Sequence, residues 1–341
     1  MSSLNGKDRM DARSAPSDKP VLVRVPASTA NLGPGFDTLG MALELYAWIE
    51  MDFSDRTQIH LYGDPMQGVS KDKSNLVYEV AQMVFEAAGV SHPELAISMY
   101  SDIPLTRGLG SSASAIVGGM VAANALIGNK LSQDELFQLA TALENHPDNV
   151  SASLFGGLTV SFWDGKRAEC IRVEPDVRLE TLVAIPEFHL STEKARKALP
   201  REISLQDAVF NVGHASLLVA AFCTGRYEMI RRAMKDALHQ PYRAALIPGM
   251  TKILEEADRH GALGAALSGA GPTLIAFVDS SSPHKSELER FLLDTLAAEK
   301  VRAQSLWLRP SQQGAQILTR LSGSSTFIEN IQASVRGEVR A

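Results

Sequence analysis

Apolar and polar positions alternate over the first hundred residues in a way that predicts several β-strands. Runs of β-branched and other apolar residues predict strands at Val21–Val25, Met41–Phe53, Arg56–Tyr62 and Leu95–Tyr100. We expect the third of these strands to pair with the second. Residues Pro26–Asp37 are rich in turn formers and predict a loop.

Helical spacing of apolar residues predicts three helices in the first half of the chain. The first covers Ser74–Ala88, with Ser74 as its N-cap. The second runs through small apolar residues from Ser111 to Leu126. The third begins at Ser132, because Glu135 completes a capping box three residues later.

The second half of the chain mixes strands and helices. Asp164-Gly165 predicts the turn of a hairpin between Gly156–Trp163 and Arg167–Val173, and Leu263–Val278 predicts a strand, a glycine turn and a strand. Two further strands are expected at Leu182–Ile185 and Val301–Leu308, and four helices at a short segment from Ser191, Ser204–Cys223, Gly249–His260 and Ser286–Ala298. This mixture without strict βα alternation predicts an α+β fold.

A chain of 341 residues is long enough for two domains. Residues 1–20 are polar and predict a disordered N-terminal tail. We place an N-terminal domain at 21–173 and a C-terminal domain at 174–311. Residues 312–341 are poorly patterned and predict a partly ordered tail.

Composition narrows the class of protein. The chain is 45% hydrophobic and 21% charged, with a net charge of −6, so nothing in its charge favours nucleic acid or an anionic membrane. Its two cysteines, Cys170 and Cys223, form no disulfide framework or zinc site and indicate a reducing cytoplasm. The N-terminus shows no apolar signal-peptide core. Gly108–Asn129 is uncharged, but its glycines, serines and asparagines favour a helix in a soluble core over a membrane span.

The segment Pro104–Leu126 carries the clearest chemical signal. Gly108 and Gly110 allow a tight turn whose backbone N–H groups point inward. A helix N-terminus follows, where unpaired N–H groups and the helix dipole favour anions, and Ser111 and Ser112 offer hydroxyls to phosphate oxygens or Mg²⁺. The Lys of a Walker loop and the spacing of a dinucleotide fingerprint are both missing. A phosphate-binding loop and a capped core helix are both compatible with this pattern.

Four other places combine polar side chains with loops. Asn31–Asp37 can hold a polar ligand or form an ordinary Asx turn. Glu144–Asn149 packs two carboxylates, an imidazole and two amides together, although its second carboxylate can instead cap the next helix. Arg196 and Arg243 can clamp a carboxylate or face solvent. Ser268–Pro272 is a second backbone nest or simply a hairpin.

These segments together resemble the GHMP kinases. The motifs are PASTANLGPGFDTLG at Pro26–Gly40, RGLGSSAS at Arg107–Ser114 and ALSGAGPT at Ala266–Thr273. Within that superfamily, ANLGPGFD, HPDNV, STEKAR and QPYRAALIPG make the chain similar to the homoserine kinase family, over Val21 to about Leu308. Many members carry another glycine near Arg107, whose side chain can neutralise phosphate or face solvent.

The resemblance implies a two-domain GHMP kinase fold, with a ribosomal S5 domain 2-like N-terminal domain, a ferredoxin-like C-terminal domain and the active site between them. ATP and Mg²⁺ would be bound, the metal at Ser112 and Glu144. The nucleotide contacts would be Asn75, Pro104, Leu105, Thr106, Arg107, Gly108, Leu109, Gly110, Ser111, Ser112 and Ser114.

The resemblance also implies transfer of the ATP γ-phosphoryl group to the hydroxyl of L-homoserine. Asp37 would take the substrate ammonium, the two arginines its carboxylate, and Asn31 and Asn149 its hydroxyl. The implied substrate contacts are Asn31, Asp37, His146, Asn149, Arg196 and Arg243, and the implied catalytic residues are Asn31, Glu144, Asn149 and Arg196. Asp148 is expected to cap a helix or to support its neighbours rather than to act as an obligate base.

Three alternatives stay open from the sequence. The chain could be a GHMP kinase for another acceptor, such as mevalonate or shikimate, although STEKAR and QPYR argue against this. It could be a non-catalytic GHMP-fold protein, although the retained phosphate loop and Glu144 argue against lost catalysis. It could also be an α+β protein with purely structural glycine turns. The resemblance is compatible with a homodimer, but no contact surface is visible in the sequence.

Overall fold

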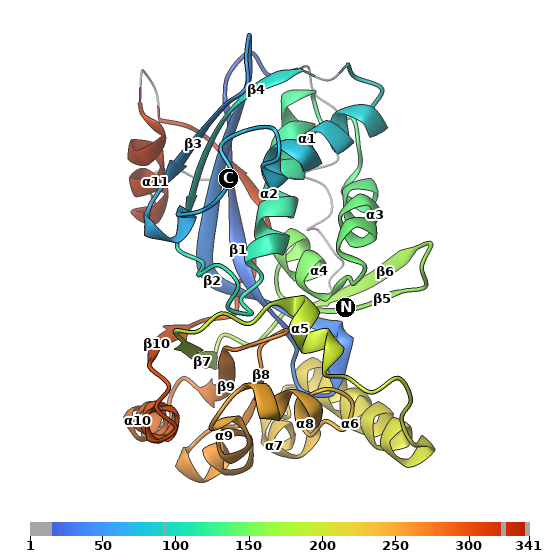
Figure 1. Ribbon diagram of the computed structural model, residues 1–341, viewed down its shortest axis with the longest axis vertical. Helices are drawn as coiled ribbons and strands as arrows, with labels where there is room; N and C mark the ends of the chain where they lie inside the picture. Colours follow the sequence, from blue (N-terminus) through green and yellow to red (C-terminus); the bar gives the residue numbers. More distant parts are fainter. Residues whose placement is uncertain (1–15, 92, 322–324, 338–341) are drawn as a thin grey trace.

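The computed structural model describes residues 16–91, 93–321 and 325–337 (Figure 1). The first fifteen residues of the expected N-terminal tail lie outside this description. Within the described residues, the larger sheet runs in the order β11-β1-β2-β4-β3, and the β5–β6 hairpin joins it through β2. Its strands are β1 (Val21–Asn31), β2 (Gly35–Ser54), β3 (Gln58–Tyr62), β4 (Glu94–Ser101), β5 (Leu158–Trp163), β6 (Ala168–Val173) and β11 (Gln316–Leu318).

Helices cover both faces of this sheet (Figure 1). A large apolar core joins one face to α1, α2, α3 and α4, and a smaller cluster around Trp48 joins the opposite face to α11. The helices of this domain are η1 (Asp64–Met66), α1 (Leu76–Ala87), α2 (Ser111–Leu126), α3 (Gln133–Glu144), α4 (Asp148–Phe155) and α11 (Phe327–Val335). The capping box at Ser132 is confirmed, since Ser132 and Glu135 exchange both hydrogen bonds.

The prediction of a loop at Pro26–Asp37 was wrong for most of that segment. Strand β1 continues to Asn31 because its residues pair with β2 through a register shift after Pro26. Only residues 32–34 form the turn. The turn-forming residues indicated the bulge and the bend, but the sheet partner decided where the strand ends.

Two smaller expectations were also wrong. Strand β3 pairs in parallel with β4, not with β2, because β4 lies between them. The N-cap of α1 is Asn75 rather than Ser74, and its side chain accepts a hydrogen bond from the backbone N–H of Val77.

The segment after residue 312 was expected to be a partly ordered tail and instead returns to the first sheet. Strand β11 pairs antiparallel with the edge of β1, from Leu22–Leu318 to Arg24–Gln316. Helix α11 begins with a capping box at Thr326 and packs Phe327 against the sheet. Pairing with a strand three hundred residues earlier leaves no local signal in the sequence.

The smaller sheet runs β10-β7-β9-β8, all antiparallel, which is the strand order of a ferredoxin-like fold. The chain passes from the larger sheet to the smaller one between β6 and β7. The strands of the smaller sheet are β7 (Leu179–Pro186), β8 (Gly264–Leu267), β9 (Leu274–Asp279) and β10 (Ala303–Leu308). The helices are α5 (Thr192–Lys197), α6 (Leu205–Thr224), η2 (Tyr227–Met229), α7 (Ile230–Ala233), α8 (Gln240–Arg243), η3 (Ala244–Leu246), α9 (Met250–Glu256), η4 (Ala257–His260) and α10 (Lys285–Ala298).

An apolar core also forms between the two sheets. Met41 and Leu43 of β2 belong to the same buried cluster as Val183 of β7, Phe277 of β9 and Phe222 of α6. This shared core fixes the two sheets relative to each other and places the loops at their junction side by side. Among the described residues, α6 is the one helix long and apolar enough to cross a membrane, and most of it lies outside the core.

Candidate active site

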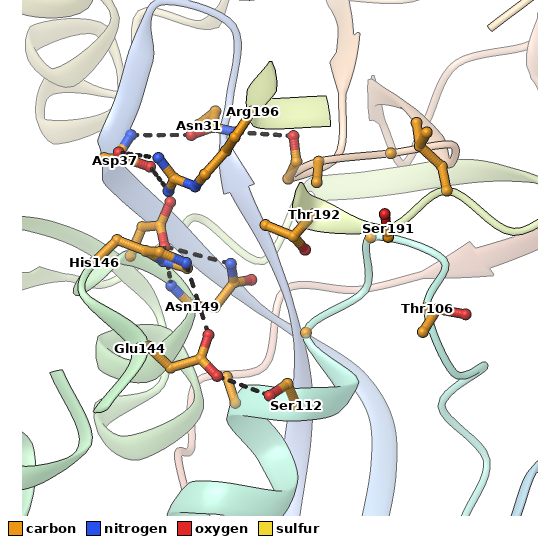
Figure 2. Close-up of a pocket in the computed structure, with 18 of the residues that line it drawn as sticks. Asn31, Asp37, Thr106, Ser112, Glu144, His146, Asn149, Ser191, Thr192 and Arg196 are labelled. Atoms are coloured by element: carbon orange, nitrogen blue, oxygen red, sulfur yellow. Dashed lines mark hydrogen bonds and ion pairs between the residues drawn. The ribbon is translucent and has the colours of Figure 1, made fainter. Parts of the chain in front are cut away.

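A cavity of about 220 Å³ opens at the junction of the two domains. Figure 2 shows Asp37 and Arg196 at one end and Ser112 and Glu144 at the other, with His146 between them. The structure brings twelve of the sequence-predicted residues to its wall: Asn31, Asp37, Thr106, Gly108, Gly110, Ser111, Ser112, Glu144, His146, Asn149, Arg196 and Arg243.

The glycine turn before α2 is closely packed. Gly110 is the N-cap of α2 at φ +70°, and a Cβ there would lie 1.9 Å from Ser28 Oγ. Gly108 has φ +79°, and a Cβ there would lie 2.4 Å from the carbonyl oxygen of Ser268. A side chain fits at neither position. The backbone can therefore curl so that the unpaired N–H groups of the first turn of α2 face the cavity.

The loop also contacts the smaller domain. Ser268 Oγ donates a hydrogen bond to the carbonyl oxygen of Gly108 at 2.5 Å, and Thr106 Oγ1 lies 2.6 Å from His189 Nδ1. Arg107 Nη2 donates to the carbonyl oxygen of Glu187 at 2.7 Å, so its side chain reaches across the domain junction. Partial burial lowers the pKa of Arg107, with Glu187 opposing that change.

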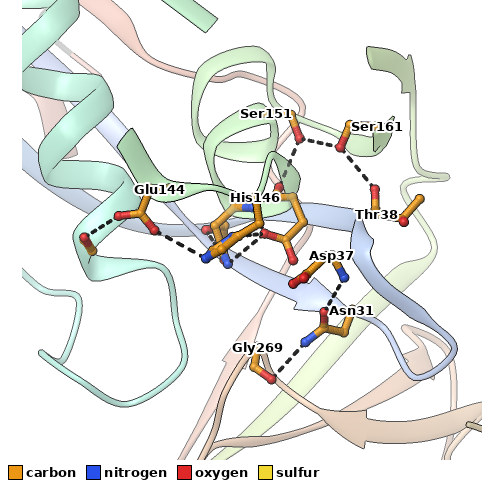
Figure 3. Close-up of polar contacts among 12 residues, drawn as sticks. Asn31, Asp37, Thr38, Glu144, His146, Ser151, Ser161 and Gly269 are labelled. Carbon is orange, nitrogen blue, oxygen red and sulfur yellow. Dashed lines mark hydrogen bonds and ion pairs between the residues drawn. The ribbon is translucent and has the colours of Figure 1, made fainter. Parts of the chain in front are cut away.

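A carboxylate and an imidazole meet beside the helix N-terminus. Ser112 Oγ donates to Glu144 Oε1 at 2.7 Å, and Glu144 Oε2 lies 3.7 Å from His146 Nε2 (Figure 3). His146 Nδ1 lies 2.8 Å from Asp148 Oδ1. Burial opposes a charge on His146, but the hydrogen bond to Asp148 and the carboxylates of Asp148, Asp37 and Glu144 outweigh it, so the pKa of His146 is raised.

Asp148 is buried beneath this group at the first residue of α4. The N-cap of that helix is Pro147, so the suggested cap role for Asp148 was wrong. Its Oδ1 instead accepts hydrogen bonds from the backbone N–H of Asn149 at 2.7 Å and from Asn149 Nδ2 at 3.3 Å. Asp148 therefore orients Asn149 and the neighbouring imidazole.

The other end of the cavity holds an ion pair. Arg196 Nη1 and Nη2 donate to Asp37 Oδ2 and Oδ1 at 3.0 and 2.8 Å, a bidentate arrangement. Asn31 Oδ1 accepts from the backbone N–H of Asp37 at 3.0 Å, and Asn31 Nδ2 donates to the carbonyl oxygen of Gly269 at 2.9 Å (Figure 3). Asn31 thus joins the turn after β1 to the glycine turn between β8 and β9.

Arg243 forms the floor of this end and is almost fully buried. Its Nη1 donates to the carbonyl oxygen of Gly269 at 3.1 Å and its Nε to that of Ala195 at 3.3 Å. Desolvation, with the nearby charge of Arg196, lowers its pKa to about 10, so the guanidinium stays charged at neutral pH.

Sequence inspection did not single out His239, which supports Arg243 from below. Arg243 Nη1 lies 3.2 Å from His239 Nδ1, and His239 Nε2 lies 2.7 Å from the carbonyl oxygen of Gly33. Because an arginine can only donate, His239 Nδ1 is the acceptor and the proton is on Nε2. Burial lowers the pKa of His239, in agreement with this neutral form. The His239 ring also stacks on Phe36, a second residue that sequence inspection missed. A single His beside the QPYR segment did not indicate its contact with Arg243 or with Phe36.

Six of the predicted nucleotide residues lie elsewhere than in the main cavity. Asn75, Leu105 and Ser114 line a second cavity of about 260 Å³, which shares Thr106, Ser111 and Ser112 with the first. Its apolar wall includes Trp48, Met66, Val69, Met99 and Tyr100, none of which the sequence analysis singled out. Leu109 is buried in the core between the sheets, and Pro104 and Arg107 line neither cavity.

Comparison with known proteins identifies the class. A family model for the GHMP kinases N terminal domain matches residues 75–157, and one for the GHMP kinases C terminal matches residues 218–293. The mevalonate kinase of Methanococcus jannaschii has the same fold, with a TM-score of 0.60 at 18% identity over 86% of this chain and 99% of that one. Fold and models together define a GHMP kinase.

More similar proteins narrow the family. A homoserine kinase from Carboxydothermus hydrogenoformans is 45% identical over 304 residues, covering 89% of this chain and 98% of the relative. One from Moorella thermoacetica is 43% identical, covering 87% and 99%. The crystal structure of homoserine kinase from Cytophaga hutchinsonii superimposes with a TM-score of 0.79 at 28% identity, covering 88% and 98%. The chain belongs to the homoserine kinase family of the GHMP kinases.

Proposed function

We propose that this enzyme transfers the γ-phosphoryl group of ATP to the side-chain hydroxyl of L-homoserine, giving O-phospho-L-homoserine for threonine biosynthesis. The observation that carries this proposal is a single cavity with two chemically different ends. One end offers the N–H groups of a helix N-terminus, and the other offers Asp37 beside two arginines. An anion and a zwitterion can therefore lie next to each other.

The nucleotide extends from the phosphate end of the main cavity into the second, apolar cavity beside it. Its phosphates lie on Gly108, Gly110, Ser111 and Ser112, where the dipole and N–H groups of α2 favour negative charge. Its base enters the adjoining apolar cavity, because that space opens directly from the phosphate loop. Asn75 has a limited part there, since its Oδ1 caps α1 and its Nδ2 donates to the carbonyl oxygen of Ser70.

Ser112 and Glu144 fit a bound Mg²⁺. Their oxygens are already within hydrogen-bond distance, and hydroxyl and carboxylate oxygens are the ligands this ion prefers. When bound there, Mg²⁺ neutralises charge on the transferring phosphoryl group. The potential ligand atoms of Asp37, His146 and Asp148 form a second set, within 4.8 Å of one another. Asp37 pairs with Arg196 and Asp148 with His146, however, so we assign Asp37 and His146 to the amino acid and Asp148 to the support of His146.

Homoserine binds at the other end. Asp37 takes its ammonium, while Arg196 and Arg243 take its carboxylate. Asp37 and Arg196 pair with each other in the free site, so the zwitterion exchanges one ion pair for two. Asn31 and Asn149 face its hydroxyl.

Placement and charge neutralisation supply most of the rate in phosphoryl transfer. We assign the positioning of the hydroxyl to Asn31 and Asn149, and stabilisation of charge to Arg196 and the metal-binding Glu144. Asp148 stays a supporting residue, because its Oδ1 is already shared by His146 and Asn149.

We further propose that the enzyme works in the cytoplasm on these small molecules, binds neither nucleic acid nor membrane, and forms a homodimer. The net charge of −6 supports the absence of nucleic-acid binding, since it opposes binding to polyanions.

A coupled ADP-release assay tests the activity. We expect turnover with L-homoserine to exceed that with L-serine, L-threonine and mevalonate by at least about tenfold. L-Serine and L-threonine carry the hydroxyl one carbon closer to the charged groups, and mevalonate has no ammonium for Asp37. Preference for mevalonate would indicate another GHMP kinase. The absence of ADP release with every acceptor would indicate a non-catalytic binding protein.

A further inference from the structure

The side chain of Arg107 leaves the phosphate loop and binds the smaller domain. Arg107 directly precedes Gly108, yet it lines neither cavity. Its Nη2 donates to the carbonyl oxygen of Glu187 at 2.7 Å. Its own carbonyl oxygen accepts a hydrogen bond from the backbone N–H of Thr273 at 3.2 Å. Both contacts direct this residue towards the smaller domain and away from the place assigned to the phosphates.

The Arg107 guanidinium is only partly paired at the domain junction. Its Nη1 is buried and has no hydrogen-bond partner among the residues that the structure describes. Burial of part of a charged group without a partner costs free energy. The hydrogen bond to the carbonyl oxygen of Glu187 offsets this cost and holds the side chain across the junction.

Thr106 makes a second contact with the same segment. Its φ is +52°, a left-handed conformation that a β-branched residue rarely adopts, so its surroundings must hold it there. Its Oγ1 lies 2.6 Å from Nδ1 of His189, two residues after Glu187. Figure 2 shows Thr106 and Ser191 on the same side of the cavity. Two neighbouring residues of the turn therefore contact one short stretch of the smaller domain.

That stretch, residues 187–191, joins the smaller sheet to helix α5. Glu187 directly follows β7, and its backbone N–H donates to the carbonyl oxygen of Arg302 at 2.9 Å. Ser191 is the N-cap of α5. The contacts of Arg107 and Thr106 therefore lie immediately before the start of this helix.

Both arginines of the amino-acid end depend on where α5 lies. Arg196 is on the helix and pairs with Asp37. Arg243 Nε donates to the carbonyl oxygen of Ala195, also on α5, at 3.3 Å. A displacement of α5 would therefore move one guanidinium and take a hydrogen-bond acceptor from the other.

We propose that Arg107, supported by Thr106, is a positioning residue for the amino-acid substrate, because it fixes residues 187–191 and through them the helix that carries Arg196. In naming homoserine as that substrate we rely on the function proposed above. A residue of the phosphate loop thus acts on amino-acid binding and not on nucleotide binding. Small displacements of groups that position a substrate are sufficient for measurable losses.

Steady-state kinetics with Arg107→Ala separate the two roles. We expect the KM for homoserine to rise about tenfold, while kcat and the KM for ATP change less than about threefold, because binding and not the transfer step loses support. Arg107→Lys keeps a donor for the carbonyl oxygen of Glu187 and should recover most of the loss. Arg172→Ala is the matched control: Arg172 Nη2 also donates to a carbonyl oxygen at 2.7 Å, that of Gln312, and lines neither cavity, so both KM values should be kept.

His189→Ala tests the same link from its other side. His189 lines neither cavity, so its loss reaches the substrate only through residues 187–191. We expect the KM for homoserine to rise about threefold, the usual effect of one hydrogen bond, at unchanged KM for ATP.

Amide hydrogen exchange in the ligand-free chain gives a result that does not depend on the substrate. Exchange at residues 187–197 should quicken at least about threefold in Arg107→Ala and stay unchanged in Arg172→Ala. A wild-type KM for homoserine in Arg107→Ala would overturn the proposal, and a rise of about tenfold in the KM for ATP in its place would assign Arg107 to the phosphates. If the parent chain phosphorylates another acceptor, the proposed function fails, but the exchange measurement still decides whether Arg107 holds this segment.

Discussion

The two ends of the active-site cavity are built by different means. The phosphate end consists mainly of backbone: two glycines and the first turn of α2 supply its donors within five residues, Gly108–Ser112. The amino-acid end consists of side chains from distant segments: Asp37 and Arg196 hold each other in a bidentate ion pair, and Arg243 is held by hydrogen bonds to backbone carbonyls. Substitutions at the first end should therefore act through backbone shape, and those at the second through loss of individual charges.

The largest effect is expected at Gly110. In Gly110→Ala the new methyl group collides with Ser28 and the residue must keep a positive φ, so the loop moves away from the phosphates. We expect kcat/KM for ATP to fall by about 100- to 1,000-fold, the usual cost of losing aligned backbone donors. Steady-state kinetics with varied ATP measure this.

Gly165→Ala is the control for this change. Gly165 also has a positive φ, +87°, but nothing lies within 4 Å of its Cβ position, so activity should be retained. If Gly110→Ala kept a third or more of the wild-type activity, the phosphate end would not depend on backbone shape as described.

The second-largest effect is expected for the two arginines of the amino-acid end, Arg196 and Arg243. Arg243→Ala and Arg196→Ala each remove a charged donor from the amino-acid end, and we expect the KM for homoserine to rise by about 10- to 100-fold. The KM for ATP should change less than about threefold. Arg232→Ala, an exposed arginine of α7, is the control. Wild-type homoserine affinity in both site variants would mean that the carboxylate is bound elsewhere.

A smaller effect is expected for Asp148→Asn. Turnover should fall less than about tenfold, since loss of an obligate general base costs about 10²- to 10⁴-fold. The substitution removes a carboxylate that raises the pKa of His146, so that pKa should fall. The limb of the pH–activity profile that reports His146 should therefore move to lower pH. A fall of 10²-fold or more with homoserine affinity unchanged would assign the base to Asp148.

The smallest effect is expected at His239, which acts through Arg243. His239→Phe keeps the stacking on Phe36 but removes the acceptor for Arg243 and the donor to Gly33. We expect the KM for homoserine to rise about fivefold at unchanged KM for ATP. His239→Gln can restore both hydrogen bonds and should recover most of the loss. Equal changes in both KM values would indicate a general packing defect.

Local signals in the sequence determined much of the protein. The capping box at Ser132, the hairpin around Asp164-Gly165 and the α+β class follow from neighbouring residues, as does the glycine turn before α2, because short-range hydrogen bonds and backbone preferences decide them. The family motifs added side chains that the fold then gathered in one cavity.

Tertiary structure alone decided the rest. It extended β1 to Asn31, placed β4 between β2 and β3, and returned β11 to the edge of β1. It also set His239 beneath Arg243 and left α6 with an uncovered apolar face. These features depend on contacts between segments far apart in the chain, and the free energy of such contacts comes from burial and pairing that no single segment contains.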